Sequence, residues 1–260
     1  MNGPPTALLP RLAAQFAAAV ADGSAGFDTA GFRVHIWPTP DPFYRNVAIP
    51  VGPACIRPDA VAAMRAVFAA HGRAPTVEYF AELWPRLAAV LTAQGLELDA
   101  RGEAMALAAP VSWAAGTGAA RLLTAADPPE QAGAFLLGAT RVFGQRAALL
   151  APGELERFVA GLRRGTLAAA ELRQGEATVA GASLIGAGAV AELAGVWTLP
   201  DHRRRSHARA CCQLLLERFF ARGGELAWLS VHEPEAARLY VGLGFRPCGT
   251  QLNFTGRASP

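Results

Sequence analysis

The residues best suited to chemistry lie between Thr198 and Ala210, where an apolar stretch gives way to a basic turn. The segment reads Thr-Leu-Pro-Asp-His-Arg-Arg-Arg-Ser-His-Ala-Arg-Ala. Pro200 favours a turn, and Ser206 favours the start of a helix. Because a helix N-terminus carries unpartnered backbone N–H groups and the positive end of the helix dipole, it attracts anions. The segment therefore predicts a loop that binds a pyrophosphate group.

The elements around this loop are predicted from apolar periodicity. Val190 to Leu199 has the pattern of a strand, and simple alternation places Glu192, Val196 and Thr198 on one face of it. An amphipathic helix follows from Ser206, since apolar residues recur at helical spacing until two glycines end the pattern.

A second strand, Leu226 to Val231, precedes a short helix that begins at Pro234 and ends at Gly244. The order strand, helix, strand, helix is typical of a parallel strand pair. The carboxyl ends of parallel strands face one crevice, so a ligand is expected to enter there.

Two motifs at this spacing match a known family. Arg203-Arg204-Arg205-Ser206-His207-Ala208 fits the acyl-CoA loop Arg/Gln-x-x-Gly-x-Gly/Ala, with Ser206 in place of the first Gly. Ala236-Ala237-Arg238-Leu239-Tyr240 followed by Gly244-Phe245 fits the family's Ala-x-x-Leu-Tyr and Gly-Phe signature. Through these residues, positions 189 to 254 resemble the core of the GCN5-related N-acetyltransferase (GNAT) superfamily.

The resemblance implies an α/β GNAT fold in the C-terminal half, a mixed central sheet flanked by helices, with acyl-CoA held between the two parallel strands. It assigns the pantetheine arm to the backbone of Val196, Trp197 and Thr198. It assigns the pyrophosphate to the loop and helix start, namely Arg203, Arg204, Arg205, Ser206, His207, Ala208 and Arg209. Ser206 adds a Cβ where glycine lets the backbone approach phosphate, but its hydroxyl suits a helix start, so weakened binding is expected.

The same resemblance makes Tyr240 the general acid that protonates the CoA sulfur. The alternative for Tyr240 is an ordinary aromatic residue on a core-facing helix stripe. Glu192, eleven residues before Arg203, matches the carboxylate base of several family members and would act through a water. A buried or paired structural glutamate is an equally open interpretation.

His232 is the other candidate base, because the unperturbed histidine pKa lies near neutrality. A plain surface or capping role is its alternative. Family members often carry Asn just before the following helix, whereas this chain has His232 and Glu233. A contact between Glu233 and CoA is therefore expected only by analogy with the family's Asn.

Composition narrows the function classes. The chain has 260 residues and a net charge of +3. It contains no Lys, so its 24 basic residues of the Lys and Arg types are all Arg. The arginine run alone could suit nucleic acid, but no aromatic-interleaved basic stripe accompanies it, so no nucleic-acid partner is expected. The four cysteines lack metal-ligand or disulfide spacing, which predicts free core thiols and no metal.

No apolar run reaches membrane-spanning length, and Arg11 and Gln15 interrupt the stretch from Ala7 to Ala21. No signal peptide and no membrane partner are expected, and a cytoplasmic protein is predicted.

Two domains are predicted, an N-terminal α/β domain over residues 1–110 and the acetyltransferase domain over 119–260, joined by Ala109 to Gly118. The elements expected in the first are strands 32–37, 46–51, 76–79 and 96–107 with helices 58–71 and 81–94. Those expected in the second before Val190 are strand 121–124, helices 128–143 and 152–163, and a hairpin of 167–173 with 176–185.

A faint repeat relates the halves, since Pro85 precedes Gly95 by the same ten positions that separate Pro234 from Gly244. The N-terminal domain is then a degenerate GNAT-like copy, in a tandem arrangement, with Leu91 in place of the tyrosine. The alternative is that any α/β domain shows such spacing.

These observations predict an acyl-CoA-dependent N-acyltransferase that moves acetyl from acetyl-CoA to a primary amine by direct attack in a ternary complex. The expected acceptor is the amine of a small molecule or a peptide. Whether the protein forms a homodimer is left open. Trp37, Phe43, Tyr44 and Trp84 line an acceptor cleft or fill the core. The alternative function is a non-catalytic acyl-CoA sensor or scaffold on the same fold.

Overall fold

The computed structural model of the chain describes residues 5–38, 46–109, 113, 120–143, 150, 153–186 and 188–257. The backbone forms two compact units that interleave along the sequence. Unit 1 contains Met1–Met105, Ser230–Pro234 and Pro247–Pro260, and unit 2 contains Ala106–Leu229 and Glu235–Arg246. The domain limits 1–110 and 119–260 stay a prediction, and most of the expected joint lies outside the described residues, as do Phe43 and Tyr44.

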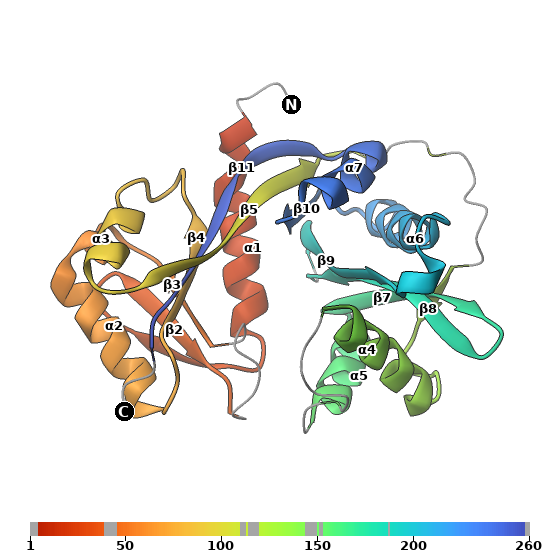
Figure 1. Cartoon of the computed structure of the whole chain (residues 1–260), viewed down its shortest axis with the longest axis horizontal. Helices are drawn as coiled ribbons and strands as arrows, with labels where there is room; N and C mark the ends of the chain where they lie inside the picture. The colour runs from red at the N-terminus through yellow and green to blue at the C-terminus, as the bar shows by residue number, and fades with distance from the viewer. Residues whose placement is uncertain are drawn as a thin grey trace. The chain divides into compact units, whose positions relative to one another are not determined.

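Unit 1 is a mixed sheet with helices against it (Figure 1). Its strands lie in the order β1-β2-β3-β4-β11-β5, in which β4 pairs in parallel with β3 and antiparallel with β11. The bounds are η1 (Pro5–Leu8), α1 (Leu9–Ala21), β1 (Ala25–Asp28), β2 (Phe32–Ile36), β3 (Val47–Pro50), η3 (Pro53–Ile56), α2 (Pro58–Ala70), β4 (Thr76–Phe80), α3 (Leu87–Ala93), β5 (Glu97–Leu107) and β11 (Arg246–Thr255).

The core of unit 1 lies between the sheet and helices α2 and α3. Strand residues at every second position, such as Val34, Val77 and Tyr79, pack in one cluster with Phe68 and Leu91, and all five are buried. These strand residues lie on one face of the sheet, as strand alternation requires. Helix α1 and strand β1 were not predicted.

The helix predicted over 81–94 is shorter in the structure, because α3 begins only at Leu87. Proline has no N–H to donate and disfavours the α conformation at the residue before it. Pro85 thus keeps residues 81–86 in turns, and the helix starts beyond it.

Unit 2 has the strand order β10-β9-β8-β7-β6. Figure 1 shows α4 and α5 on one side of these strands and α6 on the other. The bounds are β6 (Arg121–Leu123), α4 (Pro129–Phe143), α5 (Glu154–Arg164), β7 (Leu167–Gln174), β8 (Ala177–Ile185), β9 (Val190–Thr198), η4 (Pro200–His202), α6 (His207–Ala221), β10 (Leu226–Val231) and α7 (Pro234–Leu243). The elements predicted from residue 121 onward are confirmed to within a few residues.

Trp197 of β9 organises the packing under α4. It is 2% exposed, and its ring lies 5.7 Å from that of Phe135, edge to face. Gly138 on α4 and Gly181 on β8 make room for the indole, since a Cβ at either would come within 3 Å of it. Two glycines thus let the large Trp197 side chain lie directly under a helix.

Candidate active site

The backbone between β9 and α6 adopts a conformation rarely seen outside glycine. Arg204 and Ser206 both have φ 61°, and among the described residues no other non-glycine residue has positive φ. Such left-handed residues cost on the order of 1–2 kcal/mol each and occur where the surrounding structure requires them. The two unusual residues lie in the loop that the motif singled out.

This geometry fits an anion. The first intrahelical hydrogen bond of α6 is donated by the Ala210 amide to the Ser206 carbonyl, at 3.0 Å. The amides of His207, Ala208 and Arg209 therefore point out of the helix end, as helix geometry requires. Left-handed residues beside such amides are a feature of known anion-binding nests.

Ser206 stands at the start of α6, as expected, but its hydroxyl does not cap the helix. Ser206 occupies the N-cap position of α6, but its side chain makes no cap hydrogen bond. A capping side chain needs an extended backbone at that residue, whereas the left-handed φ turns the Oγ away from the first helical amides. Ser206 therefore has the conformational cost of a non-glycine residue without the benefit of a cap.

The basic side chains of the loop have different surroundings. Arg203 donates from Nε to the Thr198 carbonyl at 3.3 Å, which folds it back onto the end of β9. Arg204 and Arg205 are exposed and have no ion pair in the described part of the chain. Their charges are available to a bound diphosphate.

His207, the first residue of α6, contacts Gln174 between Nε2 atoms at 3.2 Å. Its pKa is lowered by partial burial first, and then by the nearby His202 and Arg205. The ring is therefore neutral near pH 7 and adds a hydrogen-bonding group rather than a charge.

Arg209 links the loop to the helix that carries Tyr240. Its Nη2 donates to the carbonyl of Gly242 at 3.1 Å, and the Trp113 indole donates to the Leu243 carbonyl at 3.2 Å. Both acceptors are at the C-terminal end of α7, where helical carbonyls lack intrahelical partners. The motif did not reveal this second use of Arg209.

Tyr240 lies half-buried on α7, with its ring 6.2 Å from that of Phe245. Burial, and secondarily the Cys212 thiol, raises the pKa of the phenol well above its ordinary value. The group therefore stays protonated at neutral pH, as a proton donor must.

An irregularity in β9 changes which of its residues share a face of the strand. The β8–β9 register shifts between Gly181 and Ser183, so that Ser183 faces Ala194 while Gly181 faces Trp197. β9 thus holds one extra residue, at Gly195 with φ 56°, which is a β-bulge.

Paired residues share a face, so Glu192 and Ala194 lie on the Trp197 face. Thr198 is on the other, and the prediction that Glu192, Val196 and Thr198 share a face is wrong. A glycine inside the strand was the signal for a bulge.

The parallel pairing of β9 with β10 covers only the start of each strand. Leu226 to Trp228 pair with Val190 to Glu192, and within these two described strands no later pair follows. The backbone of Val196 to Thr198 is therefore outside the parallel ladder. The resemblance assigns the pantetheine arm to this backbone, and that assignment stays a prediction.

The remaining predicted residues are placed as follows. Glu192 is half-buried opposite Trp228 and has an interaction partner of its own. His232 and Glu233 follow β10 as exposed residues and belong to unit 1. The His232 ring lies against Gly102, where a Cβ would come 3.0 Å from its Cε1. The roles of all three stay predictions.

The prediction of free thiols is confirmed, since Cys55, Cys211, Cys212 and Cys248 are buried and unbonded to one another. Within the described ranges, no helix combines the length and apolar character that crossing a membrane demands.

Comparisons with known proteins agree with this geometry. Residues 149–245 match the sequence model of the Acetyltransferase (GNAT) family. No curated protein matches the chain.

Solved structures show the fold. A GCN5-related N-acetyltransferase from Kribbella flavida is 23% identical with a TM-score of 0.77, covering 97% of this chain and 96% of that one. A putative acetyltransferase of the GNAT family from Novosphingobium aromaticivorans is 18% identical with a TM-score of 0.59, covering 90% and 92%. A tandem GNAT protein from the clavulanic acid biosynthesis pathway is 18% identical with a TM-score of 0.57, covering 88% and 79%. The chain therefore has the fold of GNAT proteins, and its residues 149–245 match the GNAT family model.

Proposed function

We propose that this protein transfers the acetyl group of acetyl-CoA to a primary amine, by direct attack of the amine on the thioester. The observation that carries the proposal is the left-handed pair Arg204 and Ser206 at the start of α6, inside the segment that matches the family. An exposed row of amides beside unpaired arginines suits the diphosphate of a nucleotide.

Each group then has one task. The amides from Arg204 to Arg209 hold the diphosphate, and the backbone of Val196 to Thr198, which lies outside the parallel ladder with β10, holds the pantetheine amides. The amine nitrogen forms a bond to the acetyl carbon as the carbon–sulfur bond breaks. Tyr240 gives its Oη proton to the departing sulfur.

The amine must lose a proton in the same reaction. Glu192 acting through a water, or His232, accepts it. The acceptor amine must be neutral to attack the thioester.

The test separates binding from chemistry. Tyr240→Phe keeps the ring but loses the proton, so kcat is expected to fall about 100-fold with little change in acetyl-CoA affinity. Arg205→Gln removes an exposed charge from the loop, so the acetyl-CoA KM is expected to rise about 10-fold at nearly constant kcat. Steady-state release of free thiol measures both.

Unchanged turnover in Tyr240→Phe removes Tyr240 from the reaction. A sensor or scaffold is distinguished by two measurements on the unmodified protein, calorimetry with acetyl-CoA and thiol release against a library of amines. Binding without thiol release from any amine favours the sensor, and absence of binding contradicts both functions.

A further inference from the structure

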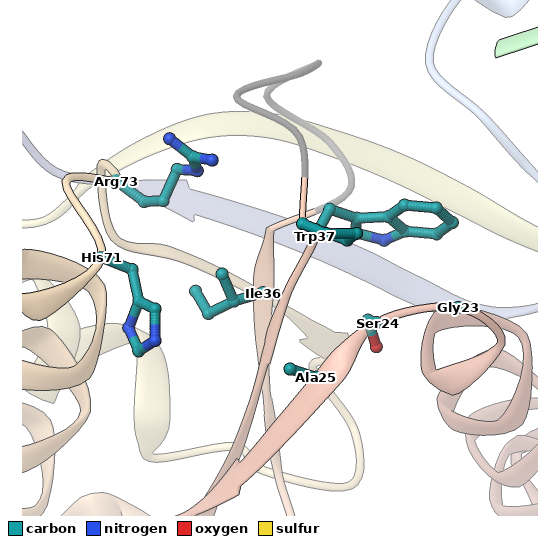
Figure 2. A pocket seen from close by; sticks show the side chains of 8 residues that line it. Gly23, Ser24, Ala25, Ile36, Trp37, His71 and Arg73 are labelled. Carbon is teal, nitrogen blue, oxygen red and sulfur yellow. The ribbon is translucent and has the colours of Figure 1, made fainter. Parts of the chain in front are cut away.

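The sheet of unit 1 has an apolar face, which forms the core, and a second face of different character. Val77 and Tyr79 of β4 belong to the buried core cluster, together with Ile36 of β2. Figure 2 shows how the two faces divide at the end of β2, where the side chains of Ile36 and Trp37 point to opposite sides of the strand. Because successive strand residues alternate between faces, Glu78 of β4 lies on the face away from this cluster.

Three polar side chains lie together on this second face, where β4 pairs with β11. Glu78 is paired with Asn253, and Thr76 is paired with Thr255 two residues further along the ladder. Paired residues of an antiparallel ladder share a face, with Cβ atoms about 5 Å apart. Thr76 is on the same face as Glu78, because it is two residues away on the same strand. Glu78, Asn253 and Thr76 therefore form one group, the Glu78 cluster, which lies entirely in unit 1.

The oxygen atoms of the Glu78 cluster lack hydrogen-bond donors. Thr76 Oγ1 and Asn253 Oδ1 are shielded from solvent and have no hydrogen-bond partner among the described residues. In the same part of the chain, no group hydrogen-bonds or ion-pairs with the Glu78 carboxyl. Burial raises the pKa of this carboxyl, and no neighbouring charge of a described residue contributes to the shift. The described residues therefore supply neither a donor nor a cation to these groups.

The chemistry of the three groups indicates the class of ligand. A desolvated carboxylate is unfavourable without a cation, and a buried amide oxygen is unfavourable without a donor. A primary ammonium group satisfies both, because it carries a positive charge and three N–H donors, one for each member of the cluster. A guanidinium group carries five donors in a fixed fork and would leave some of them unpaired. A calcium ion takes about 6–8 oxygen ligands, more than the cluster offers.

The Glu78 cluster is partly accessible to a ligand. Glu78 and Asn253 are each half-buried rather than enclosed. No hydrogen bond to a described residue holds the Asn253 side chain. The last torsion of an asparagine side chain has a broad preference, so the amide can turn its Oδ1 toward Glu78. A ligand that reaches the Glu78 carboxylate therefore also has the amide oxygen within reach.

We propose that the Glu78 cluster binds the primary ammonium group of a small organic amine. The N–H groups donate to the Glu78 carboxylate, to Asn253 Oδ1 and to Thr76 Oγ1. The carboxylate supplies the charge, and the two neutral oxygens fix the direction of the remaining donors. Binding needs neither acyl-CoA nor the loop before α6, so the site is independent of the proposed acetyl transfer.

The probe is n-butylamine, titrated by calorimetry into the full-length protein without acetyl-CoA at pH 8, which lies above the Glu78 pKa of about 7. Saturable one-site binding at low-millimolar concentration is expected. 1-Butanol, which lacks the charge, and tetramethylammonium, which lacks N–H donors, are each expected to bind at least about 10-fold more weakly. Equal binding of either compound, displacement by Ca²⁺ at constant ionic strength, or no saturable binding overturns the proposal.

Variants locate the site. Glu78→Gln removes the charge and is expected to weaken n-butylamine binding at least about 10-fold, and Asn253→Ala removes one acceptor and is expected to weaken it about 3-fold. Glu97→Gln, at an exposed glutamate of the same unit, is the matched control and should leave the affinity unchanged. Removal of an uncompensated carboxylate is not expected to destabilise the fold, so urea unfolding of each variant separates lost binding from lost structure. Parent affinity in folded Glu78→Gln, or an equal loss in Glu97→Gln, contradicts the assignment.

Discussion

At the scale of single residues, Ser206 is the clearest departure from what its position favours. It is left-handed at φ 61°, and its side chain makes no cap hydrogen bond. Glycine reaches this conformation without steric cost. Ser206→Gly is therefore expected to raise the free energy of unfolding by about 1 kcal/mol, measured by urea denaturation.

The matched control is Ser206→Ala, which removes the unused hydroxyl and keeps the Cβ. Its stability is expected to equal that of the unmodified protein. A large loss in the alanine variant would mean that the hydroxyl is bonded after all. If the amides bind diphosphate, the glycine variant also binds acetyl-CoA at least as tightly.

A second prediction at the scale of single residues concerns Glu78. It lies half-buried on β4 opposite Asn253, and burial raises the pKa of its carboxyl from 4.5 to about 7. The folded state therefore binds the proton more tightly than the unfolded state. The stability contributed by the neutral form is complete below pH 4.5 and is lost as the pH rises through 7.

Glu78→Gln keeps a neutral group at every pH. Relative to the unmodified protein, it is expected to gain up to about 3 kcal/mol of unfolding free energy between pH 4.5 and 8. Urea titrations across this range measure the difference. Glu97→Gln, at an exposed position, is the control and should leave the pH profile unchanged. Parallel profiles for Glu78→Gln and the parent would show that the carboxyl is well solvated.

At the scale of elements, the contact of α4 with β9 depends on missing side chains. A Cβ on Gly138 would come 2.1 Å from Trp197 Cη2, and the indole is almost fully buried. Gly138→Ala is therefore expected to lower the unfolding free energy by about 1–3 kcal/mol, despite the better helix propensity of alanine.

Gly133 lies on the same helix with nothing near its missing Cβ. Gly133→Ala is expected to raise the unfolding free energy by about 0.5–1 kcal/mol, because propensity alone acts there. Thermal unfolding of Gly138→Ala and Gly133→Ala separates the effect of packing from the effect of helix propensity. The same sign in both variants would contradict the proposed packing of α4 on Trp197.

At the scale of the whole molecule, the two compact units are not two consecutive pieces of chain. Strand β11 pairs with β4 from Gln251 opposite Phe80 to Thr255 opposite Thr76. A fragment of residues 119–260 would carry β11 without this partner, and an unpaired strand edge favours aggregation. We expect this fragment alone to lack cooperative unfolding.

Mixing the fragments 1–118 and 119–260 is expected to restore a cooperative transition, followed by circular dichroism. Size-exclusion chromatography shows whether the two associate. A monomeric fragment 119–260 with a sharp transition of its own would mean that β4 contributes little to its stability.

Local rules accounted for most elements but failed where a distant residue intervened. Glycine and proline marked the ends of α6 and α7. Strand alternation failed in β9, because the bulge at Gly195 depends on the register with β8. Pro85 was visible in the sequence, yet its effect on α3 was underestimated.

The sequence by itself determined the family motifs, the order of elements in the C-terminal half and the positions of the loop and Tyr240. These features depend on residue types at short spacing along the chain, within a single strand, helix or loop. Only the tertiary structure decided that Ser206 is left-handed, that Arg209 caps α7 and that β11 pairs with β4. The last two depend on groups far apart in the chain, and their energies arise only when folding brings those groups together.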